Sequence, residues 1–106
     1  MLNVLQHNFF VDAESTGTGE ILDNNLCTDL TIAVSGTAEG LEAKAYGKLG
    51  TDWYQLGLVN LTDLTVCDKI EANGLFAVGG LTGVESVKVV ISAITSGKAT
   101  IVGRLM

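Results

Sequence analysis

The sequence predicts an all-β fold, a single small antiparallel β-sandwich of the jelly-roll or immunoglobulin-like kind, with about seven to eight strands. Three observations lead to this prediction. Apolar and polar residues alternate in short runs, as they do in strands that pack one face on a core. The chain contains thirteen glycines and no prolines, and many of the glycines fall between these runs, where tight turns need them. Its 106 residues, 47% of them hydrophobic, are enough for one domain over residues 1–106 with its own core.

Seven strands follow from the alternation. We expect them near residues 3–10, 26–35, 40–48, 53–58, 73–78, 85–94 and 98–105. Their apolar rows are the expected core faces, for example Leu30, Ile32 and Val34, or Val87, Val89 and Ile91. Ser96-Gly97-Lys98 is predicted to join the last two strands as a hairpin, because Gly97 can adopt the positive φ that such a turn needs.

Two segments leave alternatives open. In residues 60–70, Leu61, Leu64 and Val66 predict either a buried loop or a short helical turn. Residues 1–19 are either an N-terminal arm and loop that reaches a neighbouring molecule, or an ordinary strand over residues 3–10 followed by a polar loop. The arm hypothesis rests on an apolar run that is suited to a strand covered on both faces.

The net charge and the N-terminal sequence restrict partners and compartment. Twelve acidic residues against six basic ones give a net charge of −6, which disfavours nucleic acid and anionic membrane surfaces as partners. The first residues lack the basic region of a signal peptide, and no apolar run has transmembrane length. We therefore expect folding in a cytosol, where Cys27 and Cys67 stay unbridged.

No arrangement of residues predicts catalysis. The single histidine, His7, lies in a predicted strand, and no nucleophile, phosphate-binding or dinucleotide motif accompanies it. Asp23, Asn24, Asn25 and Asp29 offer oxygen ligands but no recognisable calcium-loop pattern. We expect a protein that is not an enzyme and that has no cofactor and no metal.

The segment Gly50-Thr51-Asp52-Trp53-Tyr54-Gln55-Leu56 is the most distinctive in the chain. Aromatic rings after a tight turn can stack on sugars, so a carbohydrate-binding module is one hypothesis. Neighbouring strand residues point to opposite faces, and we expect Trp53 in the core and Tyr54 at the surface. The candidate contact residues for a partner or ligand are Phe9, Phe10, Asp52, Trp53 and Tyr54.

The order of segments over residues 41–105 resembles small β-sandwich virion proteins of tailed bacteriophages. The resemblance rests on the turn-Asp-Trp strand at Gly50 to Leu56 and on Ile70-Glu71-Ala72-Asn73-Gly74-Leu75-Phe76-Ala77-Val78. It continues in the long strand from Val84 to Ile94 and in the final strand from Ser96 to Leu105, which has the spacing Gly-x-x-x-x-x-Gly-Arg.

The resemblance implies a structural protein of the virion, assembled in the host cytoplasm. Its implied role is a capsid decoration or cement protein that binds the head surface repeatedly. The implied partners are the major capsid protein or another virion protein, together with copies of itself, a trimer being the first expectation. A tail or baseplate subunit and the carbohydrate-binding module are the alternatives.

Overall fold

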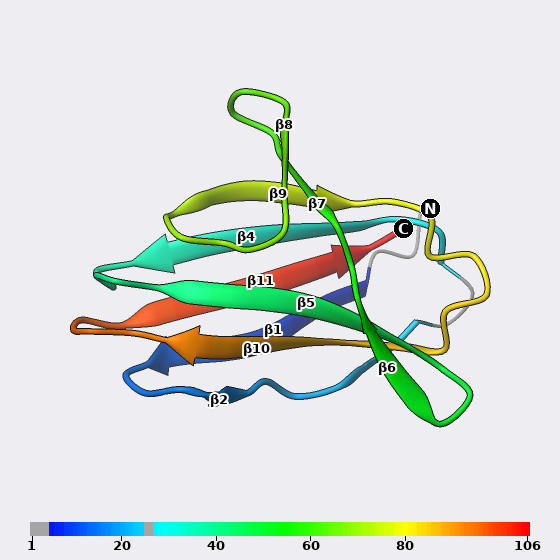
Figure 1. Cartoon of the computed structure of the whole chain (residues 1–106), viewed down its shortest axis with the longest axis horizontal. Coiled ribbons are helices and arrows are strands. Elements are labelled where there is room, and N and C mark those ends of the chain that lie inside the picture. The colour runs from blue at the N-terminus through cyan, green and yellow to red at the C-terminus, as the bar shows by residue number, and fades with distance from the viewer. Residues whose placement is uncertain (1–4, 25–26) are drawn as a thin grey trace.

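Two antiparallel sheets face each other in the computed structural model, which describes residues 5–24 and 27–106 (Figure 1). The six-stranded sheet has, in spatial order, β1 (Leu5–Ala13), β11 (Ala99–Leu105), β4 (Leu30–Gly36), β9 (Gly74–Val78), β7 (Leu58–Asn60) and β8 (Thr65–Cys67). The five-stranded sheet has β2 (Gly17–Thr18), β10 (Ser86–Ala93), β5 (Glu42–Leu49) and β6 (Asp52–Gln55), and β3 (Leu22–Asp23) also pairs with β10. The described residues contain no helix, so the predicted all-β sandwich is confirmed.

The core lies between the two sheets and is formed by the apolar rows that the alternation predicts. Inward and outward residues alternate along β4, β5, β10 and β11. The largest side chains with less than 2% exposure are Leu30, Ile32, Leu58, Ile70, Leu81, Ile91, Ile101, Leu105, Val78, Val87 and Val89. The inward residues of β5 are small, namely Ala43, Ala45 and Gly47. Larger side chains from the loops pack against these small residues. At Gly47, for example, an added Cβ would lie 3.2 Å from the Leu56 side chain.

The N-terminal segment from residue 5 onward is a strand of the sandwich. β1 pairs antiparallel with β11 from Leu5 opposite Leu105 to Ala13 opposite Ala99, with two irregularities in register. Phe9 is only 3% exposed and belongs to the core cluster. Of the two alternatives for this segment, the structure shows the strand for residues 5–13, and the first four residues lie outside the described part.

The predicted strands are present at the expected positions, but the sandwich contains additional strands and the last connection differs from the prediction. The described residues form eleven strands, and the additional ones, β2, β3, β7 and β8, have only two or three residues each. The last two strands do not form the predicted hairpin, because β10 and β11 belong to different sheets. Gly97 does have a positive φ of 79°, and its turn leads the chain from one layer to the other.

Residues 58–67 differ most from the prediction. They form a hairpin, β7–β8, rather than a buried loop, and the two strands are joined by a single helical turn closed by the hydrogen bond from the Leu64 nitrogen to the Asn60 carbonyl oxygen. The hairpin stands out from the body of the sandwich (Figure 1). Leu61, Leu64 and Val66 are 39%, 74% and 82% exposed. Apolar residues predict burial only when a neighbouring element covers them, and nothing in the described part of the chain covers these three.

Close contact between β11 and Phe9 leads to a first prediction. A Cβ at Gly103 would lie 2.5 Å from Cε2 of Phe9 and 3.1 Å from Cδ1 of Leu30. We expect Gly103→Ala to lower the free energy of unfolding by roughly 1–3 kcal/mol through overpacking. Gly57→Ala is the matched control, because no atom lies within 4 Å of a Cβ there. Equal urea midpoints for the two variants would contradict the packing of β1 on the core.

Candidate functional site

The outer face of the five-stranded sheet brings together aromatic and basic side chains. The register places Trp53 of β6 opposite Lys48 of β5, and Tyr46 of β5 opposite Lys88 of β10. The Lys88 ammonium lies 4.3 Å from the centroid of the Trp53 ring and 5.8 Å from that of Tyr46. A cation at this distance is attracted by the ring electrons and holds the aromatic side chains in place.

The prediction that Trp53 belongs to the core is wrong. Because Lys48 points outward, the residue opposite it on β6 points outward as well. The sequence pattern could not show this, since a four-residue strand gives too short an alternation to assign its faces. Tyr54 is 57% exposed, as predicted, and Asp52 is also exposed.

These contacts limit what the face can bind. Trp53 and Tyr54 are neighbours in a strand and point to opposite faces, so they do not form one stacking platform. A sugar that stacks on the Trp53 face occupied by Lys88 must first displace that ammonium group. The aromatic pair that suggested carbohydrate binding is therefore not preassembled.

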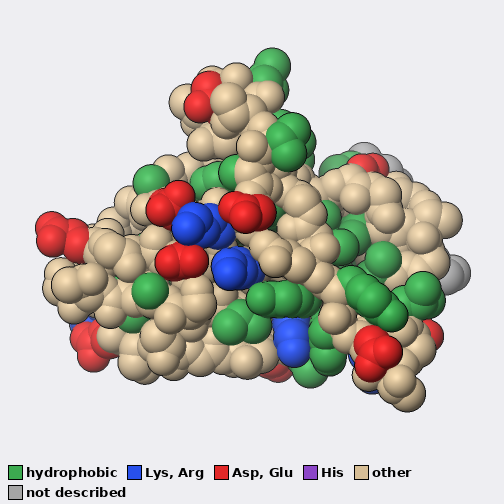
Figure 2. Space-filling view, viewed as in Figure 1, with side chains coloured by type: hydrophobic (Ala, Val, Ile, Leu, Met, Phe, Trp, Pro, Cys, Tyr) green, Lys and Arg blue, Asp and Glu red, His purple; other side chains and the backbone are tan. Residues whose placement is uncertain are grey.

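The same face concentrates positive charge on an acidic protein. Lys44, Lys48 and Lys88 alternate with inward residues and point outward on β5 and β10. They are three of the six basic residues of the chain. Figure 2 shows basic side chains gathered near the middle of one broad face, with acidic ones beside them. Lys69 adds an ion pair with Glu42 at 3.5 Å. The net charge of −6 does not predict this cluster of basic residues on one face.

The two phenylalanines predicted as contact residues lie elsewhere. Phe9 is buried in the core, and the His7 and Phe9 rings form a T-shaped pair with 4.8 Å between their centroids. His7 Nε2 lies 2.9 Å from the Glu20 carbonyl oxygen. Phe10 is half-buried against the core. The structure therefore does not bring the predicted contact residues together into one site.

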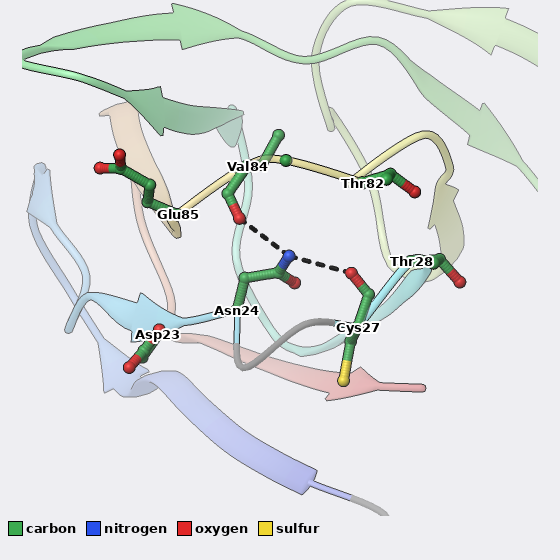
Figure 3. Close-up of a pocket in the computed structure, with 8 residues that line it drawn as sticks. Asp23, Asn24, Cys27, Thr28, Thr82, Val84 and Glu85 are labelled. Atoms are coloured by element: carbon green, nitrogen blue, oxygen red, sulfur yellow. Dashed lines mark hydrogen bonds between the residues drawn. The ribbon is translucent and has the colours of Figure 1, made fainter.

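A pocket of about 460 Å³ opens at one end of the sandwich, between the loop before β4 and the loop before β10 (Figure 3). Asn24 lies at its base and is only 2% exposed. Its side-chain nitrogen donates to the carbonyl oxygens of Cys27, Leu81 and Val84, at 2.9, 3.1 and 2.9 Å. One amide group thus joins two loops that are about sixty residues apart in the sequence.

These three carbonyls also fix the orientation of the amide, because an oxygen in place of the nitrogen would repel all of them. Asn24 Oδ1 is buried and has no hydrogen-bond partner among residues 5–24 and 27–106. The carboxylates of Asp23 and Glu85 line the pocket but point away from each other (Figure 3). The sequence suggested the Asn24 side chain as an oxygen ligand, whereas its described contacts are those of a donor. Asn25, named with it, lies outside the described residues.

The β7–β8 hairpin has a turn held by short polar contacts. Asp63 Oδ1 accepts hydrogen bonds from the backbone nitrogen and the hydroxyl of Thr65, at 3.1 and 2.6 Å. These bonds hold the pKa of the Asp63 carboxyl below its ordinary value. Asn60 Oδ1 accepts from the Thr62 nitrogen at 2.9 Å. Leu64, which lies between Asp63 and Thr65, has a left-handed backbone with φ 59°.

Neither cysteine forms a disulfide in the structure. Burial and the nearby carboxylate of Asp68 raise the pKa of the Cys67 thiol, which therefore stays protonated near neutral pH. Within residues 5–24 and 27–106, no three His, Cys, Asp or Glu side chains lie close enough to hold a metal ion. The described part of the chain has no helix long and apolar enough to cross a membrane.

Comparison with known proteins relates the chain to prophages. A protein-family model described as XepA matches residues 3–105. The SPBc2 prophage-derived protein YomS superposes with a TM-score of 0.88 at 20% sequence identity, covering 97% of this chain and 92% of that one. The PBSX exported protein XepA superposes with a TM-score of 0.92 at 25% identity, covering 97% of this chain but only 37% of that one. No curated protein matches the chain closely enough to count as a relative.

The Asn24 contacts lead to a second prediction. Asn24→Ala leaves three inward-facing carbonyls without their donor, and we expect it to lower the free energy of unfolding by about 2 kcal/mol. Asn73→Ala is the control, since the Asn73 side chain donates only to the Gly36 carbonyl at an exposed position. We expect this control to cost about 1 kcal/mol or less. Urea unfolding of both variants checks the difference, and a larger loss in the control would contradict the role of Asn24.

Proposed function

This chain belongs to the XepA family, and from that premise we propose that it is a non-enzymatic phage protein that acts by binding other virion components. One observation supports this most strongly. The same sandwich accounts for nearly all of YomS but for only 37% of the XepA chain. A fold that occurs both almost alone and within a longer chain is typical of a self-contained binding or structural module.

The specific role that we propose is capsid decoration. The domain is small, and its protruding hairpin presents Leu64 and Val66 to the outside. Such a domain can occupy many equivalent positions on a particle, where repeated weak contacts add up to stable attachment. We propose that it does so as a homo-oligomer bound to the major capsid protein or another virion protein, with a trimer as the first expectation. The proposed location is the virion, assembled in the host cytoplasm.

The described contacts of the reactive side chains favour a role without catalysis. His7 packs on Phe9 and bonds to a backbone carbonyl, which are structural contacts. The Cys67 thiol has a raised pKa, whereas a nucleophilic cysteine needs a lowered one.

Two alternative functions remain compatible with the structure. A carbohydrate-binding module is favoured by the outward group of Trp53, Tyr46 and Lys88. A tail or baseplate subunit is equally compatible with the fold. The neighbour XepA is described as exported, which leaves action outside the virion as a further outcome for the test below.

Imaging and sedimentation of phage particles test the proposed function. Particles produced without this chain are mixed with the purified protein, pelleted, and examined by electron cryomicroscopy. We expect saturable binding in many copies per particle and added density on the head. Added density on the tail would favour the tail alternative. Absence of binding, together with absence of the chain from wild-type particles, would overturn the proposal.

A glycan array tests the carbohydrate alternative independently. We expect no saturable sugar binding by the wild-type chain, because Lys88 occupies a face of Trp53. Saturable binding that disappears in Trp53→Ala, with an unchanged circular dichroism spectrum, would instead favour the carbohydrate-binding module.

A further inference from the structure

The tip of the β7–β8 hairpin is an exposed apolar projection with a rigid base. Leu64 and Val66 are 74% and 82% exposed. The backbone of Leu64 is left-handed, a strained conformation for a leucine that persists only where the surroundings enforce it. Here the hydrogen bond from the Leu64 nitrogen to the Asn60 carbonyl, at 2.7 Å, and the Asp63–Thr65 contacts enforce it. A projection whose backbone is already ordered loses less entropy on binding than a mobile loop does.

The outer face of the six-stranded sheet contains a hollow of about 390 Å³ that suits such a projection. Its floor is Ala33 of β4, and the register places Leu75 of β9 and Val102 of β11 directly opposite it on either side. The strands that carry Leu75 and Val102 are two strand spacings apart, which is about 9.5 Å. A trough therefore lies between two apolar walls, with the small side chain of Ala33 at its base. The volume of the hollow leaves room for a leucine side chain.

The charges beside the projection and the hollow are complementary. Asp63 precedes Leu64 and stays ionised, since its hydrogen bonds lower the pKa of its carboxyl. Arg104 lines the hollow, is exposed, and is not part of an ion pair within the described residues. A carboxylate next to the projection and a guanidinium next to the hollow favour one orientation of docking.

We propose that the hairpin tip of one copy of this chain docks in the hollow of a second copy, with Leu64 between Leu75 and Val102 of the partner. This inference rests on the self-association that is part of the proposed function, and it names the two surfaces that make the contact. Because the two surfaces differ, the contact is head-to-tail, and each copy can bind one neighbour through its tip and another through its hollow.

Two variants that are not expected to unfold the chain test the contact. Leu64→Asn removes the projection and places a residue that tolerates a left-handed backbone at φ 59°. Ala33→Leu fills the hollow at a strand position where a larger side chain is accepted. Sedimentation velocity of the wild type should show assemblies larger than the 11.1 kDa monomer. Each variant alone should raise the dissociation constant about 10-fold to 100-fold.

A mixture of the two variants provides the decisive measurement. Leu64→Asn keeps an intact hollow and Ala33→Leu keeps an intact tip, so an equimolar mixture should form a dimer that does not grow further. Leu49→Asn is the matched control, because Leu49 is 60% exposed on the other sheet, and it should associate as the wild type does. Arg104→Gln removes the charge without creating a repulsion, and it should weaken association a few-fold and reduce its dependence on salt.

The outcomes separate this contact from the proposed function. A wild-type chain that stays monomeric at all accessible concentrations, variants that associate like the wild type, or a mixture that forms no dimer would each overturn the head-to-tail contact. All these measurements use the isolated chain. Particle binding can therefore persist when the contact fails, and its loss would leave the contact intact.

Discussion

Contact between two inward rows of aliphatic side chains determines where every surface of this protein lies. β4 and β11 supply one row, and β5 and β10 supply the other. Because side chains alternate strictly along a strand, burial of Val87, Val89 and Ile91 obliges Lys88 and Val90 to face outward. The outward positions of Lys88 and of the lysines on β5 are thus consequences of core packing. A shift of one residue in register would bury the lysines and expose the core.

The strands could be predicted from the sequence because their evidence is local. Long alternating runs such as Ser86–Ala93 identify a strand and its buried face without any knowledge of its neighbours. Pairing is not local, and the sequence therefore did not reveal that β10 and β11 lie in different sheets. Gly97 has the predicted positive φ, although its turn connects two sheets rather than two strands of one hairpin. The same reason explains Trp53, whose orientation depends on its cross-strand partner Lys48.

The candidate surfaces were harder to predict than the core. Leu61, Leu64 and Val66 look like core residues in a sequence, and only the protruding hairpin shows that they are exposed. Asn24 has the composition of an ordinary turn residue, yet it donates to carbonyls of two separate loops. Such contacts depend on loop conformation, for which hydrophobic periodicity contains no information. Net charge likewise averages over faces and conceals a cluster of lysines.

The place of β11 in the six-stranded sheet affects the order in which the protein can fold. β11 is the last strand of the fold, yet it lies between β1, the first strand, and β4. During synthesis, β1 has no partner in its sheet until nearly all of the chain has left the ribosome. Pairings between such distant segments are slow to form. The apolar residues of β1 are exposed during that interval, and a chaperone or a neighbouring chain that covers them would limit aggregation of the nascent protein.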